Sequence, residues 1–298
     1  MIVAENISKN FNDIKAIDSI SAEIKKGSIF GLIGTNGAGK STFLRMLSGI
    51  YRPDSGKITI DGAEVFENID VKKRVFYISD DQYFLAASTP KMMANFYASV
   101  YETFDMARFD SLLKSFDLDP SRKINTFSKG MKKQVSIICG LAAGTDYIFC
   151  DETFDGLDPV MRQAVKSLLA ADVADKQLTP IIASHNLREL EDICDHVGLL
   201  HKGGILLNKD LDDMKTNIHK VQCVLPENTD LQELGLSVLQ SEKRGSLSII
   251  IARGEAEDIM RRIHASNPIF AEILPLTLEE IFISETEVAG YDIKKILI

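Results

Sequence analysis

The sequence lacks the long apolar runs that membrane-spanning chains require. Its longest apolar stretch, from Val135 to Cys150, is interrupted by serine, glycine, threonine and aspartate. No run therefore reaches the ~18 consecutive apolar residues of a transmembrane helix. The first ten residues mix charged and polar side chains with short apolar groups, so we expect no signal peptide. Any role at a membrane is expected to depend on a partner protein.

Basic charge and paired cysteines are also scarce. The 298 residues include 34 Lys and Arg against 43 Asp and Glu, a formal net charge of −9. This acidic balance lacks the basic surface that attracts nucleic acid, so no nucleic-acid partner is expected. The four cysteines have no C-x-x-C spacing and indicate reduced thiols of a cytosolic protein. What remains is ordinary globular composition at a length typical of two domains.

Most of the chain alternates between strand and helix patterns. Short strands are predicted over residues 14–24, 28–33, 74–79, 147–150 and 180–184, with helices from Lys40 and over 161–171. Such alternation favours an α/β fold with a parallel sheet. Between Thr89 and Ala143 the apolar period is helical, which predicts a helical subdomain inserted at about residues 86–143. Within it, a Met and aromatic stripe from Met92 to Tyr101 is interpreted as core, although part of it could form a groove for a partner helix.

The pattern changes after about Lys215. Strands are predicted over 221–225, 236–239 and 247–252, the last two as an antiparallel pair, and helices over 256–265 and 278–283. The predicted domains are therefore residues 1–215 and a small α+β domain over 216–298. No motif in the second domain marks a site.

Residues 34 to 42 match a phosphate-binding loop. The sequence Gly34-Thr35-Asn36-Gly37-Ala38-Gly39-Lys40-Ser41-Thr42 fits G-x-x-x-x-G-K-[ST] between a predicted strand and a predicted helix. Glycines let the backbone N–H groups turn inward around phosphates, and the helix N-terminus adds its positive dipole. We expect Lys40 to neutralise the β- and γ-phosphates and Ser41 to bind Mg²⁺. The loop predicts a nucleoside triphosphate site.

Two acidic residues follow the predicted strand over 147–150. Asp151 comes at the end of the strand, where a carboxylate can hold Mg²⁺ and its water shell. Glu152 comes next and could polarise an attacking water as a general base. Alone, this pair would indicate only a solvated strand end, but the phosphate loop makes the catalytic interpretation the stronger one.

These motifs, in this order, make residues 1 to about 215 resemble the ATP-binding subunit of an ABC transporter. In that family residues 34–42 would be Walker A, and residues 147–152 Walker B with the catalytic glutamate. Residues 155–158 resemble the D-loop, and Ser184-His185 resembles the switch histidine. Phe127-Ser128-Lys129-Gly130-Met131 occupies the place of the LSGGQ signature.

The resemblance implies a P-loop NTPase (RecA-like) core that dimerises head to tail on two Mg-ATP. Ser128, Gly130 and Asp158 would then contact the nucleotide of the partner domain, and His185 would contact the γ-phosphate. Phe11 lies where an aromatic ring stacks on adenine, with an ordinary half-buried aromatic as the alternative.

The sequence departs from the family pattern at the signature and at the Q-loop. Phe127, Lys129 and Met131 replace residues of LSGGQ, and an SKGM-type signature is associated with exporters of the drug, peptide and bacteriocin-resistance type. The Q-loop glutamine, which contacts Mg²⁺, is replaced by Asp80; Asp80 is favoured as the metal contact, and Gln82 is the alternative.

The expected function is ATP hydrolysis that drives a separate integral membrane permease, with export of drugs, peptides or lipid-like molecules. The chain would act as a homodimer or with a paralogous subunit, cytoplasmic and peripheral on the inner face of the membrane. One alternative is a soluble ABC-type ATPase that acts on ribosomes or DNA. Another is a regulatory ATP-binding subunit that does not transport.

Overall fold

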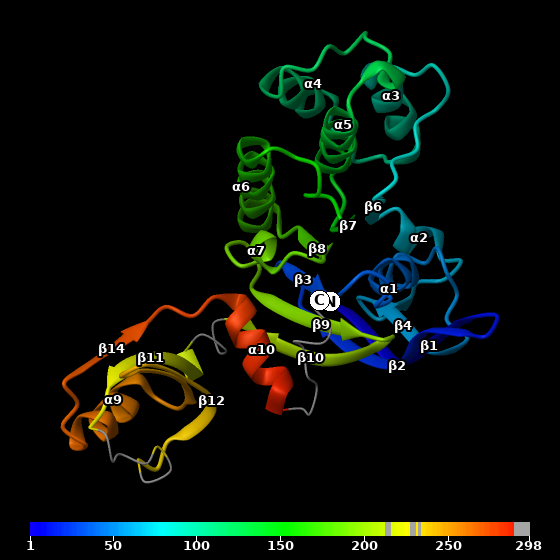
Figure 1. Ribbon diagram of the computed structural model, residues 1–298. Helices are drawn as coiled ribbons and strands as arrows, with labels where there is room; N and C mark the ends of the chain where they lie inside the picture. Colours follow the sequence, from blue (N-terminus) through cyan, green and yellow to red (C-terminus); the bar gives the residue numbers. More distant parts are fainter. Residues whose placement is uncertain (212–215, 227–230, 232–233, 289–298) are drawn as a thin grey trace. The chain divides into compact units, whose positions relative to one another are not determined.

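The computed structural model describes residues 1–211, 216–226, 231 and 234–288 (Figure 1). The chain divides into two compact units, residues 1–208 and residues 209–298. The boundary predicted at about Lys215 falls among residues 212–215 and so lies outside the described part.

The first unit contains strands and helices that alternate along the chain. In order they are β1 (Ile2–Phe11), β2 (Ile14–Ile24), β3 (Phe30–Ile33), α1 (Lys40–Leu47), β4 (Ser55–Ile60), β5 (Ala63–Glu64), α2 (Ile69–Lys72), β6 (Val75–Ile78), α3 (Pro90–Val100), α4 (Met106–Ser115), α5 (Lys129–Ala142), β7 (Tyr147–Asp151), α6 (Pro159–Lys176), β8 (Thr179–Ser184), α7 (Leu187–Leu190), β9 (His196–His201) and β10 (Gly204–Asp210). A short 3₁₀ turn, Ile124–Thr126, precedes α5.

A six-stranded sheet in the order β10-β9-β3-β8-β7-β6 carries the site. The pairs β3–β8, β3–β9, β6–β7 and β7–β8 are parallel. This confirms the predicted parallel sheet, although β9 is not among the predicted strands. Every residue of β3, β7 and β8 is buried, which explains why these strands are continuous apolar runs. Because the strands are parallel, the loops that follow β3, β6, β7 and β8 meet at one edge of the sheet, the usual ligand edge of such folds.

A second sheet, in the order β2-β1-β4-β5, is antiparallel. The sequence pattern predicts β2 but not β1, because β1 does not alternate regularly. Register shifts interrupt its pairing with β2 after Ala4, and Asn6 has a positive φ of 47°. Ile7 and Ile17 of this sheet and Phe43 of α1 are buried in one core, so the sheet supports the helix that follows the phosphate loop.

Helices α3, α4 and α5 form a group of their own at the top of Figure 1. Thr89 caps α3 by accepting a hydrogen bond from the Met92 N–H at 3.3 Å, with Pro90 at the first helical position. The core interpretation of the stripe on α3 is only half right. Tyr97 packs on Phe76 with ring centroids 5.1 Å apart, whereas Met92, Phe96 and Val100 are 42–52% exposed. They recur every four residues on one helix face that no described element covers.

The described part of the second unit includes a four-stranded antiparallel sheet and the helices α9 and α10. Its elements are β11 (Ile218–Val224), β12 (Ser237–Arg244), β13 (Leu247–Arg253), α9 (Ala256–Ala265), β14 (Phe270–Leu274) and α10 (Leu278–Val288). The sheet order is β12-β13-β11-β14. The predicted antiparallel pair is β12 with β13, where Arg244 lies opposite Leu247, while β14 is not predicted by the sequence pattern. A small core includes Val221, Ile250 and Ile259.

Candidate nucleotide-binding and hydrolysis site

The loop between β3 and α1 has the backbone that a phosphate nest requires. Gly37 and Gly39 have φ values of 81° and 106°, in the left-handed region that favours glycine. A Cβ atom on Gly39 would lie 2.6 Å from the Ala16 carbonyl oxygen, and one on Gly34 would lie 2.6 Å from that of Leu200. Side chains are therefore excluded at both positions, which lets the loop pack closely at the N-terminus of α1.

Lys40, the first residue of α1, folds back over this loop. Its ammonium group donates to the Gly34 carbonyl oxygen at 2.7 Å and to that of Thr35 at 3.3 Å. The same nitrogen lies 3.0 Å from Oε1 of Glu152, and the two side chains are 5% and 13% exposed. The predicted phosphate-binding lysine and the predicted general base are thus in direct contact, although they are far apart in the sequence.

Ser41 and Asp151 form the second contact between the phosphate loop and β7. The Ser41 hydroxyl donates to Oδ1 of Asp151 at 2.9 Å. The other carboxylate oxygen accepts from the Tyr77 hydroxyl, also at 2.9 Å. Burial raises the pKa of Asp151 above its ordinary value, and the two hydrogen bonds partly offset this by stabilising the carboxylate. The serine and carboxylate oxygens are of the kind that Mg²⁺ prefers.

Glu152 has a strained backbone that aims its side chain at the loop. Its φ is 48°, in the left-handed region, and its N–H donates to the Ala183 carbonyl oxygen of β8 at 3.0 Å. Its Oε2 lies 2.8 Å from Nδ1 of His185, the residue that follows β8. Because Asp151 pairs with Ala183 in the β7–β8 ladder, Glu152 and His185 leave the sheet side by side.

Asp80 and Gln82 follow β6 and have different contacts. The Gln82 amide donates to the carbonyl oxygens of Ser79 and Asp80, at 2.9 and 2.8 Å, within its own loop. Oδ1 of Asp80 instead accepts from the Lys133 ammonium of α5 at 3.2 Å. Because Ile78 pairs with Cys150 in the β6–β7 ladder, Asp80 lies at the same edge of the sheet as Asp151.

The signature residues lie at the start of α5. Ser128 caps this helix by accepting from the Met131 N–H at 3.2 Å. A Cβ atom on Gly130 would lie 3.1 Å from the Gly156 carbonyl oxygen, so the glycine allows the signature and the D-loop segment to approach closely. Asp158 caps α6 by accepting from the N–H groups of Val160 and Met161, each at 3.0 Å. Each of these three predicted contact residues has a structural role within its own chain.

Phe11, at the end of β1, is 39% exposed. Its ring meets that of Tyr51 edge to face, with centroids 5.5 Å apart, and the Lys9 ammonium lies 5.7 Å from the Phe11 centroid. The Phe11 ring is thus fixed by its contact with Tyr51 while part of its surface faces solvent, as stacking on a base would need.

Three residues at these contacts were not predicted from the sequence: Tyr51, Tyr77 and Lys133. A signal exists for Lys133, which lies four residues before Ile137 and seven before Gly140. A lysine on that buried face of a helix is unusual enough to indicate a paired charge. No comparable pattern distinguishes Tyr77 within its strand.

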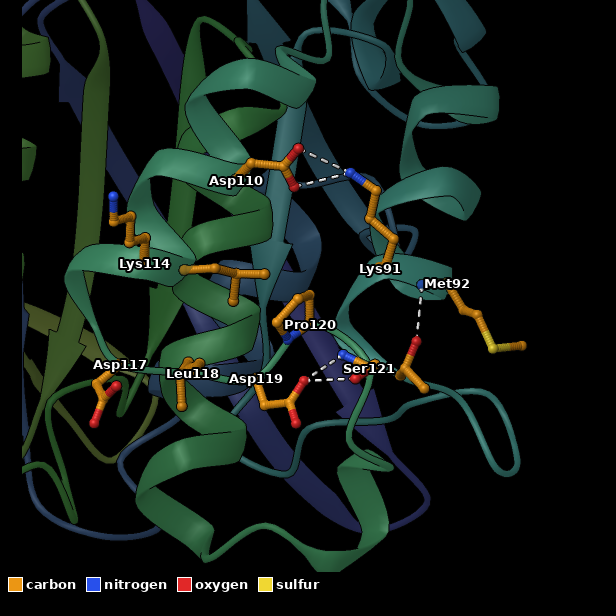
Figure 2. A pocket seen from close by; sticks show the side chains of 11 residues that line it. Lys91, Met92, Asp110, Lys114, Asp117, Leu118, Asp119, Pro120 and Ser121 are labelled. Atoms are coloured by element: carbon orange, nitrogen blue, oxygen red, sulfur yellow. Dashed lines mark hydrogen bonds and ion pairs between the residues drawn. The ribbon is translucent and has the colours of Figure 1, made fainter.

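The helical group carries a hollow of ≈ 900 Å³, shown in Figure 2. Met92 and Pro120 line it, and the Lys91 ammonium forms an ion pair with Asp110 at 2.8 and 2.9 Å across it. Met92 also belongs to the exposed stripe of α3. Apolar surface in the hollow therefore continues onto that helix face.

The four cysteines are free and buried. Burial raises the pKa of Cys150 to about 12, which keeps this thiol protonated and unreactive at neutral pH. Among the described residues, no three His, Cys, Asp or Glu side chains converge as a metal site. A cation bound here would therefore take further ligands from the nucleotide or from water, as Mg²⁺ does at phosphate sites.

Comparison with known proteins identifies the family. The family model described as ABC transporter matches residues 17–155. The ABC transporter ATP-binding protein YtrB of Bacillus subtilis is 30% identical over 96% of this chain and 98% of its own length. The bacitracin transport ATP-binding protein BcrA of Bacillus licheniformis is 30% identical over 74% of this chain and 73% of its own.

Solved structures agree with these relatives. The structure of an ATP-binding subunit of an ABC transporter matches with a TM-score of 0.66 and 26% identity, over 72% of this chain and 92% of that one. A dimeric ATP-binding cassette bound to ADP and phosphate has a TM-score of 0.65 at 20% identity, over 71% of this chain and 99% of that one, and supports the P-loop NTPase fold. Within the described residues no helix has the length and apolarity to cross a bilayer. The chain belongs to the ABC transporter ATP-binding proteins, and it is an ATPase of that type.

Proposed function

We propose that the edge of the six-stranded sheet is the hydrolysis site of this ATPase and that its turnover drives a separate membrane permease. One observation carries the proposal. Lys40, Glu152 and His185, which come from the loops after β3, β7 and β8, form one chain of contacts, 3.0 Å from Nζ to Oε1 and 2.8 Å from Oε2 to Nδ1. A cation can neutralise phosphate charge, a carboxylate can accept a proton from water, and an imidazole beside it can orient the reacting groups, so this set suits water attack on a γ-phosphate.

The role of each residue follows from its contacts. Lys40 binds the β- and γ-phosphates, together with the backbone N–H groups of the loop. Glu152 accepts a proton from the attacking water. His185 contacts the Glu152 carboxylate through Nδ1 and the γ-phosphate through its other ring nitrogen. In a head-to-tail dimer, Ser128, Gly130 and Asp158 complete the site from the second subunit. Phe11 stacks on the adenine.

Mg²⁺ fits the oxygen donors present. Ser41 and Asp151 would hold it directly or through water, with Asp80 as a further oxygen ligand from the neighbouring strand end. When bound, it neutralises charge on the β- and γ-phosphates. We expect turnover to stop in excess EDTA and to return on addition of Mg²⁺.

The Ser41→Ala variant removes one oxygen ligand, so it should need about 10-fold more Mg²⁺ for half-maximal turnover. The control is Ser136→Ala on α5, which changes a hydroxyl outside the site. Equal Mg²⁺ requirements in Ser41→Ala and the wild type would contradict this assignment.

The exposed face of α3 is the surface proposed for the permease. Met92, Phe96 and Val100 lie on it, and Tyr83 nearby is 82% exposed. Apolar side chains at a four-residue spacing suit a helix of the partner. The cargo proposed is a drug, peptide or lipid-like molecule, which the signature over 127–131 and the similarity to a bacitracin transport protein support.

The test is to purify the tagged full-length chain from its native membranes in mild detergent and identify bound proteins by mass spectrometry. We expect a multi-span protein in stoichiometric amount, and a loss of that protein in the Phe96→Glu variant with ATP turnover retained. The control is Ile269→Glu, which changes an 83% exposed residue of the second unit. Ribosomal proteins or nucleic acid in place of the permease would overturn the proposal in favour of a non-transport ATPase.

A further inference from the structure

A fully buried lysine joins two segments of the hydrolysis site. Lys133 lies on α5, five residues after Ser128, and its side chain is 0% exposed. Its ammonium group donates to the Glu152 carbonyl oxygen at 2.6 Å and to Oδ1 of Asp80 at 3.2 Å. One side chain of the signature helix therefore contacts both the loop after β6 and the loop after β7.

An ammonium group is expensive to bury. Removal of the charge from water destabilises the folded chain unless an opposite charge and hydrogen bonds compensate. Asp80 supplies the charge, and its own side chain remains 53% exposed. Packing alone would be served better by an apolar side chain of similar length. The contacts of the ammonium group with Asp80 and Glu152 therefore explain a lysine at this position better than packing does.

Both contacts act on residues to which the proposed function gives a role. Glu152 has a positive φ of 48°, a conformation that is unfavourable for a non-glycine residue. A charged donor on the carbonyl oxygen of Glu152 stabilises this conformation and so the direction of the Glu152 side chain. The same ammonium group balances Asp80, the acid that stands where the family has a neutral glutamine.

We propose that Lys133 is a positioning residue for hydrolysis, and that its charge allows an aspartate to take the place of glutamine at the Q-loop position. It keeps Glu152 aimed at the site through its carbonyl oxygen, and it pairs with Asp80, which carries a charge that the family's glutamine lacks. Asp80 and Lys133 then work as a pair. This inference rests on the roles proposed above for Glu152 and Asp80.

The test is a double-mutant cycle on the full-length chain, with kcat and KM for ATP measured at saturating Mg²⁺. Lys133→Gln leaves Asp80 uncompensated, and Asp80→Gln leaves the buried ammonium without its carboxylate. We expect each single change to lower kcat about 10-fold with KM within about 3-fold of the wild type. The double variant, in which two neutral amides can pair, should recover to within about 3-fold of the wild-type kcat.

Two further variants separate positioning from folding. Lys133→Met keeps the length and packing without the charge, so its melting temperature should match or exceed that of the wild type while kcat stays low. Lys132→Gln removes a neighbouring charge on the same helix and should leave kcat unchanged. A double variant whose loss is the product of the single losses would overturn the inference, as would wild-type kcat in Lys133→Met.

The parent proposal is checked by a different variant. If Glu152→Gln keeps its turnover, the proposed function itself fails. If Glu152→Gln is inactive while the Asp80 and Lys133 losses simply multiply, only the positioning role fails.

Discussion

The two units of the chain differ in how deeply their charged side chains are buried. In the first unit Lys40, Lys133 and Asp151 are 5%, 0% and 1% exposed, and all three belong to contacts of the site. Among the described residues of the second unit, ion pairs range from partly buried, as between Lys220 and Glu280 at 20% and 31% exposure, to exposed, as between Arg244 and Glu242 at 67% and 55%. Exposed pairs contribute at most about 1 kcal/mol each, whereas unpaired buried charges are strongly destabilising. Buried, paired charge also occurs in the first unit away from the site, as between Lys166 and Asp192 and between Arg108 and Asp172. Contact with the phosphate loop and the strand ends beside it therefore distinguishes the site residues, in addition to burial.

The largest expected difference between the units is the response to loss of a carboxylate. Glu152→Gln removes the general base, so ATP turnover should fall about 1,000-fold while ATP binding persists and dimers accumulate on ATP. The same change at Glu272, an exposed residue of β14, should leave turnover unaltered. Turnover is measured as phosphate release, and dimerisation by light scattering after size exclusion. Wild-type turnover in Glu152→Gln would remove this residue from the role of base.

Removal of a lysine should change the affinity for ATP when the lysine lies in the first unit, and not when it lies in the second. Lys40→Ala removes the cation that contacts the Gly34 carbonyl oxygen and the Glu152 carboxylate, and we expect the Kd for ATP to rise about 100-fold. Lys243→Ala, on the exposed surface of β12, is the control and should leave the Kd unchanged. Isothermal titration calorimetry measures both. Retained affinity in Lys40→Ala would contradict the phosphate-binding assignment.

The smallest expected effect on turnover comes from the core of the second unit. Ile250 is 0% exposed within that core, and Ile250→Ala should lower the free energy of unfolding of the unit by about 3 kcal/mol. Denaturant unfolding followed by circular dichroism should show the destabilisation as an earlier transition. ATP turnover should stay within about 2-fold of the wild type, with Ser237→Ala as the control for a surface change. A large loss of turnover would show that the two units depend on each other more than their separate cores indicate.

The parts of the molecule that the sequence predicts are those where spacing alone carries the information. The loop over 34–42 and the strand before Asp151 have fixed patterns, and the structure brings their residues together. The β1 strand escapes prediction because bulges break its alternation. Site contacts that form only in the folded chain were not predicted. Tyr77 and Lys133 are examples, because their partners Asp151 and Asp80 are 74 and 53 residues away in the chain.

The contacts of Glu152 also bear on when the site can act. Lys40 holds one oxygen of its carboxylate and His185 the other, so the base is engaged on both sides before any water could reach it. A triphosphate brings enough negative charge to compete for Lys40, and a diphosphate lacks the terminal group that would do so. In the mechanism proposed above, binding of ATP would free the Glu152 carboxylate from Lys40, and departure of the cleaved phosphate would let the ion pair re-form. Hydrolysis would then be suppressed between cycles, when no triphosphate is bound.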